Sequence, residues 1–327
     1  MGARRKAAIA GSLGLAMLLV AACGGGDDGG ESSDGTPTVR LIVSEGDSLP
    51  FIGAEAGAAL GVWDDKGINV KIIDGTSSTV GPSIASGNAE IGLGTGVKAA
   101  SDIIAGLDAT LTAGDVLPWD QYVIASPDAG ASKPEDLKGK KFGISSFGSA
   151  GHFATLTVAK NLGWSESDYE VVPLGNLEGL LGALRSGTID AFIWSIETVL
   201  TAENEGFGEN LGSVADLVGP NAFEAFLVSN KYAKEHPENV KAFFEGYFEA
   251  VEKLQADPDW VKKFVVDEWK KDPEVADEAV DLLLPILSTD GEIPQENLEG
   301  LADAVHTTVE GIGDFDITSI YSYWKDL

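Results

Sequence analysis

The stretch SGNAEIG at residues 86–92 decides the fold, because SGTIDAF at residues 186–192 repeats its pattern in a later part of the chain. In each copy a helical segment stops at Ser-Gly, two residues follow, and an acid leads into small and apolar residues. Glycine commonly ends a helix, and a short apolar run of this kind is typical of a buried strand. The repeat therefore predicts two similar α/β halves with a cleft between them.

Around the first copy, apolar runs alternate with segments of helical spacing, which predicts βαβ units and a parallel sheet. The expected strands are residues 39–43, 68–73, 91–93 and 109–113, and the expected helices are 50–62, 76–87 and 97–105. The pattern restarts around the second copy, with strands at 142–144, 169–173 and 190–194 and helices at 149–162 and 179–186.

From residue 230 onward the chain is mostly helical in pattern. Three helices are expected to begin at Pro237, Pro258 and Pro273, because proline lacks the N–H that a helix start leaves unpaired. Each of these prolines is followed by an acid, which favours the positive end of the helix dipole. The aromatic residues between 243 and 248 fall on one helix face and indicate core packing.

The first 22 residues predict a secretory signal peptide: a basic start at Arg4, Arg5 and Lys6, an apolar run, and small residues before Cys23. The run is too short to span a bilayer core of about 30 Å. Small residues before a cysteine resemble the bacterial lipoprotein signal, in which that cysteine is lipidated. An ordinary cleaved signal remains an alternative, and the arginine pair gives weaker support for twin-arginine export. Residues 23–38 lack aliphatic and aromatic side chains after the cysteine and predict a lipidated, flexible tether.

Composition excludes several classes of function. The single cysteine leaves no disulfide, thiol nucleophile or cysteine-bound metal, and three scattered histidines give no metal signature. The net charge of −30 makes nucleic acid and anionic membrane surfaces poor partners. No cofactor and no metal site are expected.

Several stretches in order resemble one family: GAALGVWDDKGINVKII, IASGNAEIGLGT, SKPEDLKGKKFGISSFGSAGHF, LRSGTIDAFIW and LVSNKYAKEHPENVKAFFEGYFEAV. They resemble the substrate-binding proteins of ABC importers with the type II periplasmic-binding fold, in the branch for nitrate, sulfonates, taurine and thiamine-precursor pyrimidines. A departure lies at residues 194–197, Trp-Ser-Ile-Glu, where many relatives carry Trp-x-Pro.

The resemblance implies an α/β protein of two lobes with a helical C-terminal region packed on lobe 1. The expected boundaries are 39–122 for the first part of lobe 1, 123–225 for lobe 2, and 226–327 for the return to lobe 1 with the C-terminal helices. The crossovers are expected near 120–126 and 223–229. The resemblance also implies a monomer outside the cytoplasm, anchored to the outer face of the cell membrane or on the periplasmic side, with ABC permease subunits as partners.

The ligand is expected beyond the carboxyl ends of the strands, where helix N-termini present N–H groups. Hydroxyl, amide and acidic residues recur at these strand ends on both halves, and two aromatic residues there could stack on a flat ligand. The expected ligand-binding residues are Asp47, Ser48, Thr76, Ser77, Thr95, Gly96, Ser146, Phe147, Gly148, Ser149, Asn176, Trp194 and Glu197.

The loops at the strand ends carry three acids, Glu45, Asp47 and Glu197, against Lys98 as a single cation. This excess of negative charge favours a neutral or cationic heterocycle or amine as the ligand. Arg185 is expected to cap a helix end instead. The alternative in the same fold is a binder of nitrate, sulfonate or taurine. Two further alternatives are a secreted hydrolase, for which the G-x-S-x-G elbow around Ser149 is missing, and a surface scaffold or adhesion lipoprotein.

The lipid anchor is testable at Cys23. Substituting Cys23→Ala should move the protein from the membrane fraction to the soluble fraction or block its processing, which fractionation and mass spectrometry measure. Unchanged membrane retention and unchanged mass would contradict the anchor.

Overall fold

The computed structural model describes residues 35–309 and 311–327. The expected signal peptide, the lipidation site at Cys23 and most of the expected tether lie outside the described residues, so they stay predictions. Among the described helices, none is both long and apolar enough to cross a membrane.

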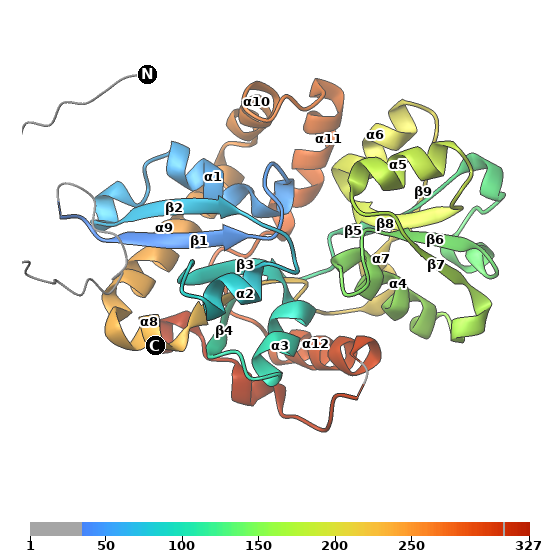
Figure 1. The fold of residues 1–327 in the computed structure, drawn as a ribbon. Helices are drawn as coiled ribbons and strands as arrows, with labels where there is room; N and C mark the ends of the chain where they lie inside the picture. Colours follow the sequence, from blue (N-terminus) through green and yellow to red (C-terminus); the bar gives the residue numbers. More distant parts are fainter. Residues whose placement is uncertain (1–34, 310) are drawn as a thin grey trace, which may run out of the picture.

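The described chain forms two lobes, each built on a five-stranded sheet (Figure 1). The lobe 1 sheet has the order β2-β1-β3-β10-β4, with β1 Thr38–Val43, β2 Asn69–Asp74, β3 Ile91–Thr95, β4 Ala109–Val116 and β10 Glu224–Ser229. The lobe 2 sheet has the order β7-β6-β8-β5-β9, with β5 Gln121–Ala125, β6 Lys141–Ile144, β7 Glu170–Pro173, β8 Ala191–Ser195 and β9 Glu209–Ser213.

Both sheets repeat one topology, as the sequence repeat predicts. Strands β1, β2 and β3 pair in parallel in lobe 1, and β6, β7 and β8 do so in lobe 2. The fourth strand in each order, β10 or β5, runs antiparallel to its neighbours. Each sheet is therefore mixed, because each antiparallel strand enters from the other lobe.

The chain crosses between the lobes twice, through residues 117–120 and 219–223. The sequence analysis places these crossovers a few residues later, where the structure has the strands β5 and β10. The expected lobe boundaries at residues 122 and 225 consequently fall just inside those two strands. Strand β9 has no counterpart among the expected strands.

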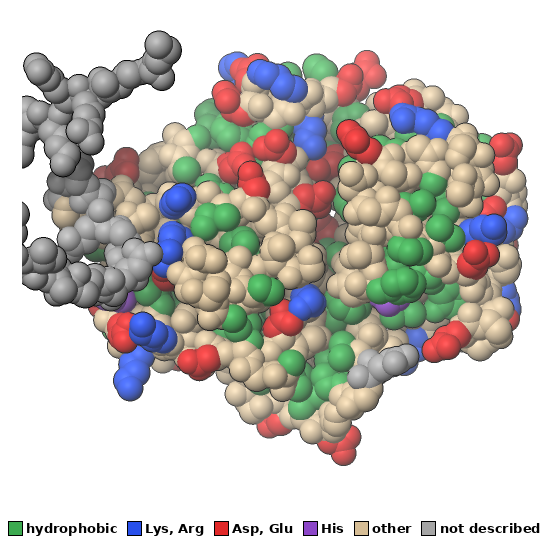
Figure 2. Space-filling view, viewed as in Figure 1, with side chains coloured by type: hydrophobic (Ala, Val, Ile, Leu, Met, Phe, Trp, Pro, Cys, Tyr) green, Lys and Arg blue, Asp and Glu red, His purple; other side chains and the backbone are tan. Residues whose placement is uncertain are grey.

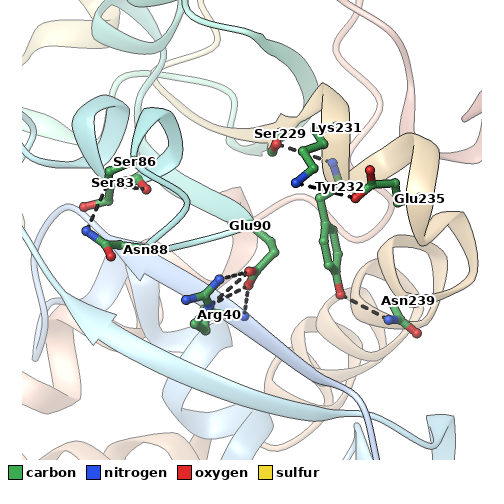
Figure 3. Close-up of polar contacts among 10 residues, drawn as sticks. All are labelled: Arg40, Ser83, Ser86, Asn88, Glu90, Ser229, Lys231, Tyr232, Glu235 and Asn239. Atoms are coloured by element: carbon green, nitrogen blue, oxygen red, sulfur yellow. Dashed lines mark hydrogen bonds and ion pairs between the residues drawn. The ribbon is translucent and has the colours of Figure 1, made fainter. Parts of the chain in front are cut away.

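The acid of the sequence repeat fixes the register of the parallel strands. In lobe 1 the Glu90 carboxylate accepts hydrogen bonds from the backbone N–H of Arg40, at 2.7 Å, and from its guanidinium (Figure 3). In lobe 2 the Asp190 carboxylate accepts from the backbone N–H of Lys141 at 2.8 Å. Each acid thus ties the start of its strand to the first parallel strand of its lobe.

The remaining residues of the repeat end the preceding helix. Gly87 and Gly187 have φ angles of 71° and 68°, the left-handed conformation that glycine adopts without strain. The amide of Asn88 donates to Ser86 Oγ in lobe 1, where Figure 3 shows both beside the strand start, and Ser186 contacts Thr188 in lobe 2. The turn therefore positions Glu90 and Asp190 equivalently, each beside the first parallel strand of its lobe.

Helices cover the faces of both sheets (Figure 1). Lobe 1 carries α1 Ile52–Ala59, preceded by the 3-10 turn Leu49–Phe51, α2 Val80–Ala85 and α3 Gly96–Ile104. Lobe 2 carries α4 Ala150–Asn161, α5 Leu177–Arg185, α6 Ile196–Asn204 and α7 Val214–Val218. The C-terminal part adds α8 Asn230–Glu235, α9 Pro237–Ala256, α10 Pro258–Asp267, α11 Pro273–Leu283 and α12 Gln295–Thr308.

The long helix α9 packs on α1 of lobe 1, as expected for the C-terminal region. Gly246 permits this approach, because a Cβ there would lie 2.4 Å from the ring of Trp63. The Trp63 indole also donates to the carbonyl of Phe243 at 3.0 Å. Helices α11 and α12 reach further: α11 contacts α6, and α12 contacts both α3 and α4. The C-terminal helices therefore touch lobe 2 as well as lobe 1.

The repeat acid makes a prediction about stability. Glu90→Gln should lower the free energy of unfolding by about 2 kcal/mol, because a buried charged acceptor of several hydrogen bonds is lost. Asp190→Asn should cost less, since Asp190 is less buried and is bonded to one backbone N–H. Urea denaturation measures both, and equal costs in the two lobes would contradict this assignment.

Candidate functional site

A cleft of about 410 Å³ lies between the two lobes, and Figure 2 shows the hollow that separates them. Strand ends and helix starts from both lobes line it. On the lobe 1 side the lining residues are Ser44, Glu45, Phe51, Gly75, Thr76, Ser77, Ser78, Thr95 and Glu224. On the lobe 2 side they are Gln121, Ser145, Ser146, Gly148, Ser149, Ala150, Gly151, Gly175, Asn176, Leu177 and Trp194.

The structure brings together most of the residues expected at the ligand. Those that line the cleft are Thr76, Ser77, Thr95, Ser146, Gly148, Ser149, Asn176 and Trp194. They come from the carboxyl ends of the strands of both lobes, which meet at the cleft because the two sheets share one topology. The other expected residues, Asp47, Ser48, Gly96, Phe147 and Glu197, are not among the lining residues.

Glu197 belongs to a buried contact behind the cleft. Its carboxylate lies 3.5 Å from the Lys271 ammonium and accepts from the backbone N–H of Leu49 at 3.4 Å. The hydroxyl of Ser48 is a further hydrogen-bond partner of the same carboxylate. Glu197 and Ser48 therefore contact each other across the lobes and are not among the lining residues, and their expected contact with the ligand stays a prediction. The reason is tertiary, since Lys271 arrives from the distant C-terminal helices.

Three other expected residues have roles outside the lining. Gly96 packs against the second crossover, where a Cβ would lie 2.1 Å from the carbonyl oxygen of Ala222. Asp47 is exposed with a φ of 51°, beyond the cleft. Phe147 is 66% exposed, with its ring edge-on to His152 at 5.3 Å, although its loop neighbours line the cleft. Phe147 itself is not among the lining residues.

The lobe 2 wall of the cleft consists of helix starts. Ser149 Oγ accepts from the backbone N–H of His152 and caps α4, and Asn176 Oδ1 accepts from the N–H of Gly179 at 2.9 Å and caps α5. The ring Nδ1 of His152 accepts from the N–H of Gly148 at 3.1 Å. Ser149 and His152 thus both accept hydrogen bonds from backbone N–H groups at the N-terminus of α4, which gives both a structural role. Two helix N-termini carry partial positive charge and suit an anionic group.

The floor of the cleft is acidic. Glu224, at the start of β10, lies opposite Thr95 in the strand register, and both are buried. Glu224 Oε2, Thr95 Oγ1 and Gln121 Oε1 have no hydrogen-bond partner within the described chain. Buried polar atoms are normally paired, so these three unpaired atoms, on residues that line the cleft, are candidates for a contact with a ligand.

Burial raises the pKa of Glu45 to about 7, an effect that the neighbouring Glu197 increases and Lys271 opposes. Burial also raises the pKa of Glu224 well above its ordinary value, and Asp120, Asp115 and Glu45 add to the rise. Burial and the neighbouring acids therefore favour the protonated forms of Glu45 and Glu224 in the empty cleft. Among the described residues that line the cleft, none is Lys, Arg or His.

The nearby cations are engaged elsewhere. Lys98 pairs with Asp102 on its own helix, and Arg185 pairs with Glu205 and stacks over the ring of Phe207. Arg185 stands in the last turn of α5, where its charge complements the helix dipole as expected. Figure 2 shows acidic side chains along the upper part of the groove between the lobes.

Several lining residues are missing from the sequence-based set, among them Gln121 and Glu224. Both stand at the first position of a crossing strand, β5 or β10. The signal that could have identified them is the crossover itself, because a chain that passes between two lobes must run along the cleft. Glu45 was identified as a strand-end acid, and it lines the cleft.

The model of the family described as NMT1/THI5 like matches residues 50–261. The chain belongs to this family. Its relatives include the taurine-binding periplasmic protein of Escherichia coli K12, 31% identical over 134 residues, which are 40% of this chain and 41% of that protein. A candidate aliphatic sulfonates-binding protein of Bacillus subtilis strain 168 is 26% identical over 86% of this chain and 79% of that protein.

Solved structures share the fold. The alkanesulfonate-binding protein of Xanthomonas axonopodis pv. citri, bound to MOPS, superposes with a TM-score of 0.73 at 16% identity, covering 88% of this chain and 98% of that one. A Bordetella bronchiseptica RB50 protein gives a TM-score of 0.75 at 20% identity, covering 88% and 94%. The predicted family and the two-lobed periplasmic-binding fold are confirmed. Three of the named relatives are described as binding proteins for taurine or sulfonates, and the match to the taurine-binding protein spans less than half of its length.

The acids behind the cleft predict an unusual pH dependence of stability. Burial raises the pKa of Asp115 to about 8, and the hydroxyl of Tyr247 donates to it at 2.9 Å. The folded state therefore holds this proton more tightly than the unfolded chain. Stability from this group is full below its unfolded pKa of about 4 and is lost as pH rises toward about 8.

Asp115→Asn keeps an acceptor for Tyr247 and removes the charge. The stability of the variant relative to the parent should therefore rise by at least about 1 kcal/mol between a pH of about 5 and a pH of about 9. Thermal melts across this range measure the effect, with Asp65→Asn on an exposed turn as the matched control. A parent whose stability rises through this range would contradict the prediction.

Proposed function

We propose that this protein is the extracytoplasmic binding component of an ABC importer and that it captures a small zwitterion with an amine and a sulfonate or similar anionic group. It binds the ligand between its lobes without chemical change and delivers it to permease subunits. The observation that carries the proposal is the polarity of the cleft: acids without a cation on the floor, and helix starts with hydroxyl groups on the lobe 2 wall.

The two ends of the ligand have separate partners. Glu45 and Glu224 are placed to accept hydrogen bonds from an ammonium group, whose charge would offset their burial. The starts of α4 and α5, with Ser149 and Asn176, are placed to bind the anionic oxygens. Trp194 supplies an apolar wall for the carbon chain between them.

This assignment joins the two ligand classes that the sequence left open. The acids support the cationic amine of the first interpretation, and the taurine- and sulfonate-binding relatives support the alternative. Taurine carries both groups. A flat heterocycle has weaker support, because Phe147 lies outside the lining in this conformation. We also propose that Cys23 carries a lipid that holds the protein at the membrane.

Calorimetry with taurine, ethanesulfonate and ethylamine tests the proposal. Taurine should bind most tightly, and each half-ligand should bind at least about tenfold more weakly because it leaves one end of the cleft unpaired. The bound taurine should be recovered unchanged. Ethanesulfonate binding as tightly as taurine would show that the acids take no part, and tight binding of ethylamine alone would favour a purely cationic ligand.

Variants of residues on the floor and on the lobe 2 wall of the cleft distinguish binding of the ligand's ammonium end from binding of its anionic end. Glu224→Gln should weaken taurine binding by about thirty-fold or more and leave ethanesulfonate binding nearly unchanged, since the ammonium loses a carboxyl group whose ionised form a bound cation favours. Ser149→Ala should weaken both ligands. Glu135→Gln, an exposed acid on lobe 2, is the matched control and should change neither.

A further inference from the structure

The sequence repeat that sets the fold continues as far as the cleft. The tenth residues of its two copies, Thr95 and Ser195, end the central strands β3 and β8 and precede the helices α3 and α6. A serine or threonine at this position normally accepts a hydrogen bond from an N–H of the first helical turn. Ser149 and Ser229 do so at their helices, but neither Thr95 nor Ser195 makes such a bond. These two hydroxyl groups therefore do not cap their helices.

Each of the two hydroxyl residues stands opposite the first residue of a crossing strand. In the antiparallel pairing of lobe 1, Thr95 lies opposite Glu224, and in that of lobe 2, Ser195 lies opposite Gln121. Residues that are directly opposite in an antiparallel pair have Cβ atoms about 5 Å apart. Each lobe therefore brings the same two positions together where the chain crosses between the lobes.

The side chains at all four positions are buried, with exposed fractions of 2% for Thr95, 4% for Glu224, 6% for Ser195 and 9% for Gln121. Each has a polar atom without a hydrogen-bond partner within the described chain: Thr95 Oγ1, Glu224 Oε2, Ser195 Oγ and Gln121 Oε1. Buried polar atoms without a partner are costly and rare. Thr95, Glu224 and Gln121 line the cleft, whereas Ser195 is not among the lining residues. Three unpaired buried atoms are therefore gathered on residues of one cleft.

The chemistry of these three atoms suits a group that donates hydrogen bonds. An amide oxygen and an ionised carboxylate oxygen only accept, and a hydroxyl oxygen can accept as well. A primary ammonium group carries three N–H donors, one for each of the three oxygens. Its positive charge favours the ionised form of Glu224. Glu45 also lines the cleft but is only partly buried, so water can pair with its carboxylate in the empty protein.

We propose that Thr95, Glu224 and Gln121 form a subsite that accepts one N–H each from a primary ammonium group and thereby selects primary amines over N-methylated ones. The proposal rests on the proposed function, which assigns the floor of the cleft to the ligand's ammonium group. Two of the acceptors belong to lobe 1 and one to lobe 2. Each N-methyl group removes a donor and leaves a buried acceptor unpaired, which disfavours the methylated ligand.

Calorimetry with taurine, N-methyltaurine and N,N-dimethyltaurine tests the selectivity. Taurine should bind at least about tenfold more tightly than N-methyltaurine and at least about a hundredfold more tightly than N,N-dimethyltaurine, because each methyl group leaves one more acceptor unpaired. All three ligands keep the sulfonate and the positive charge, so the comparison isolates the number of N–H donors.

Substitution at Thr95 distinguishes hydrogen bonding from a merely steric effect of the methyl groups. Thr95→Val removes one acceptor and keeps the shape of the side chain, so taurine should bind about tenfold more weakly. N-methyltaurine should lose less than about threefold, because its two N–H groups still have two acceptors. Gln121→Met should narrow the preference in the same way. Ser195→Ala removes the equivalent hydroxyl outside the lining and is the matched control, which should change neither affinity.

Thermal melts of the empty variants test for a structural role. The melting temperature of Thr95→Val should not fall, because the hydroxyl that it loses has no partner in the empty protein. A clear fall in melting temperature, together with equal weakening of taurine and N-methyltaurine, would show that Thr95 acts on the fold and would overturn the proposal.

The outcomes also separate this subsite from the proposed function. Tight binding of taurine with equal affinity for N,N-dimethyltaurine would refute the subsite and leave the zwitterion-binding function in place. Tight binding of ethylamine alone would refute the proposed function, and a preference for ethylamine over N,N-dimethylethylamine would then still support the subsite. A parent protein that binds none of these amines would overturn both.

Discussion

A carboxylate at the start of a strand, bonded to the backbone of the neighbouring parallel strand, organises both lobes. Glu90 holds the N–H of Arg40, and Asp190 holds the N–H of Lys141. A strand that slips by one residue turns its apolar side chains to the wrong face, so a fixed register matters throughout a buried sheet. With the register set at the far end of each sheet, the carboxyl ends of the strands reach the cleft together, and their loops form its walls.

The cleft combines two electrostatic surfaces that the fold produces separately. Helix starts on lobe 2 are positive through their unpaired N–H groups, whatever side chains they carry. The acids on the floor come from a strand-end loop and from a crossing strand, Glu45 and Glu224. Burial makes their charge costly in the empty protein, and a bound cationic group would remove much of that cost. Ligand preference is therefore coupled to the charge state of the floor.

The C-terminal helices join the lobes as well as covering lobe 1. Helix α11 contacts α6, helix α12 contacts α4, and the loop before α11 brings Lys271 to Glu197. These contacts place part of the electrostatic environment of the cleft outside the segment shared with the family.

The sequence by itself determined the two α/β halves, the proline-started helices and most of the strand-end residues at the cleft. These features follow from local chemistry: glycine at helix ends, proline at helix starts, the periodicity of apolar residues, and polar residues in the loops after strands. It did not determine which residues line the cleft. Gln121 and Glu224 enter the cleft because the crossing strands run along it, and Glu197 is withdrawn because Lys271 pairs with it. The direction in which such a side chain points and the group with which it pairs depend on contacts between residues distant in the chain. No local sequence pattern encodes those contacts.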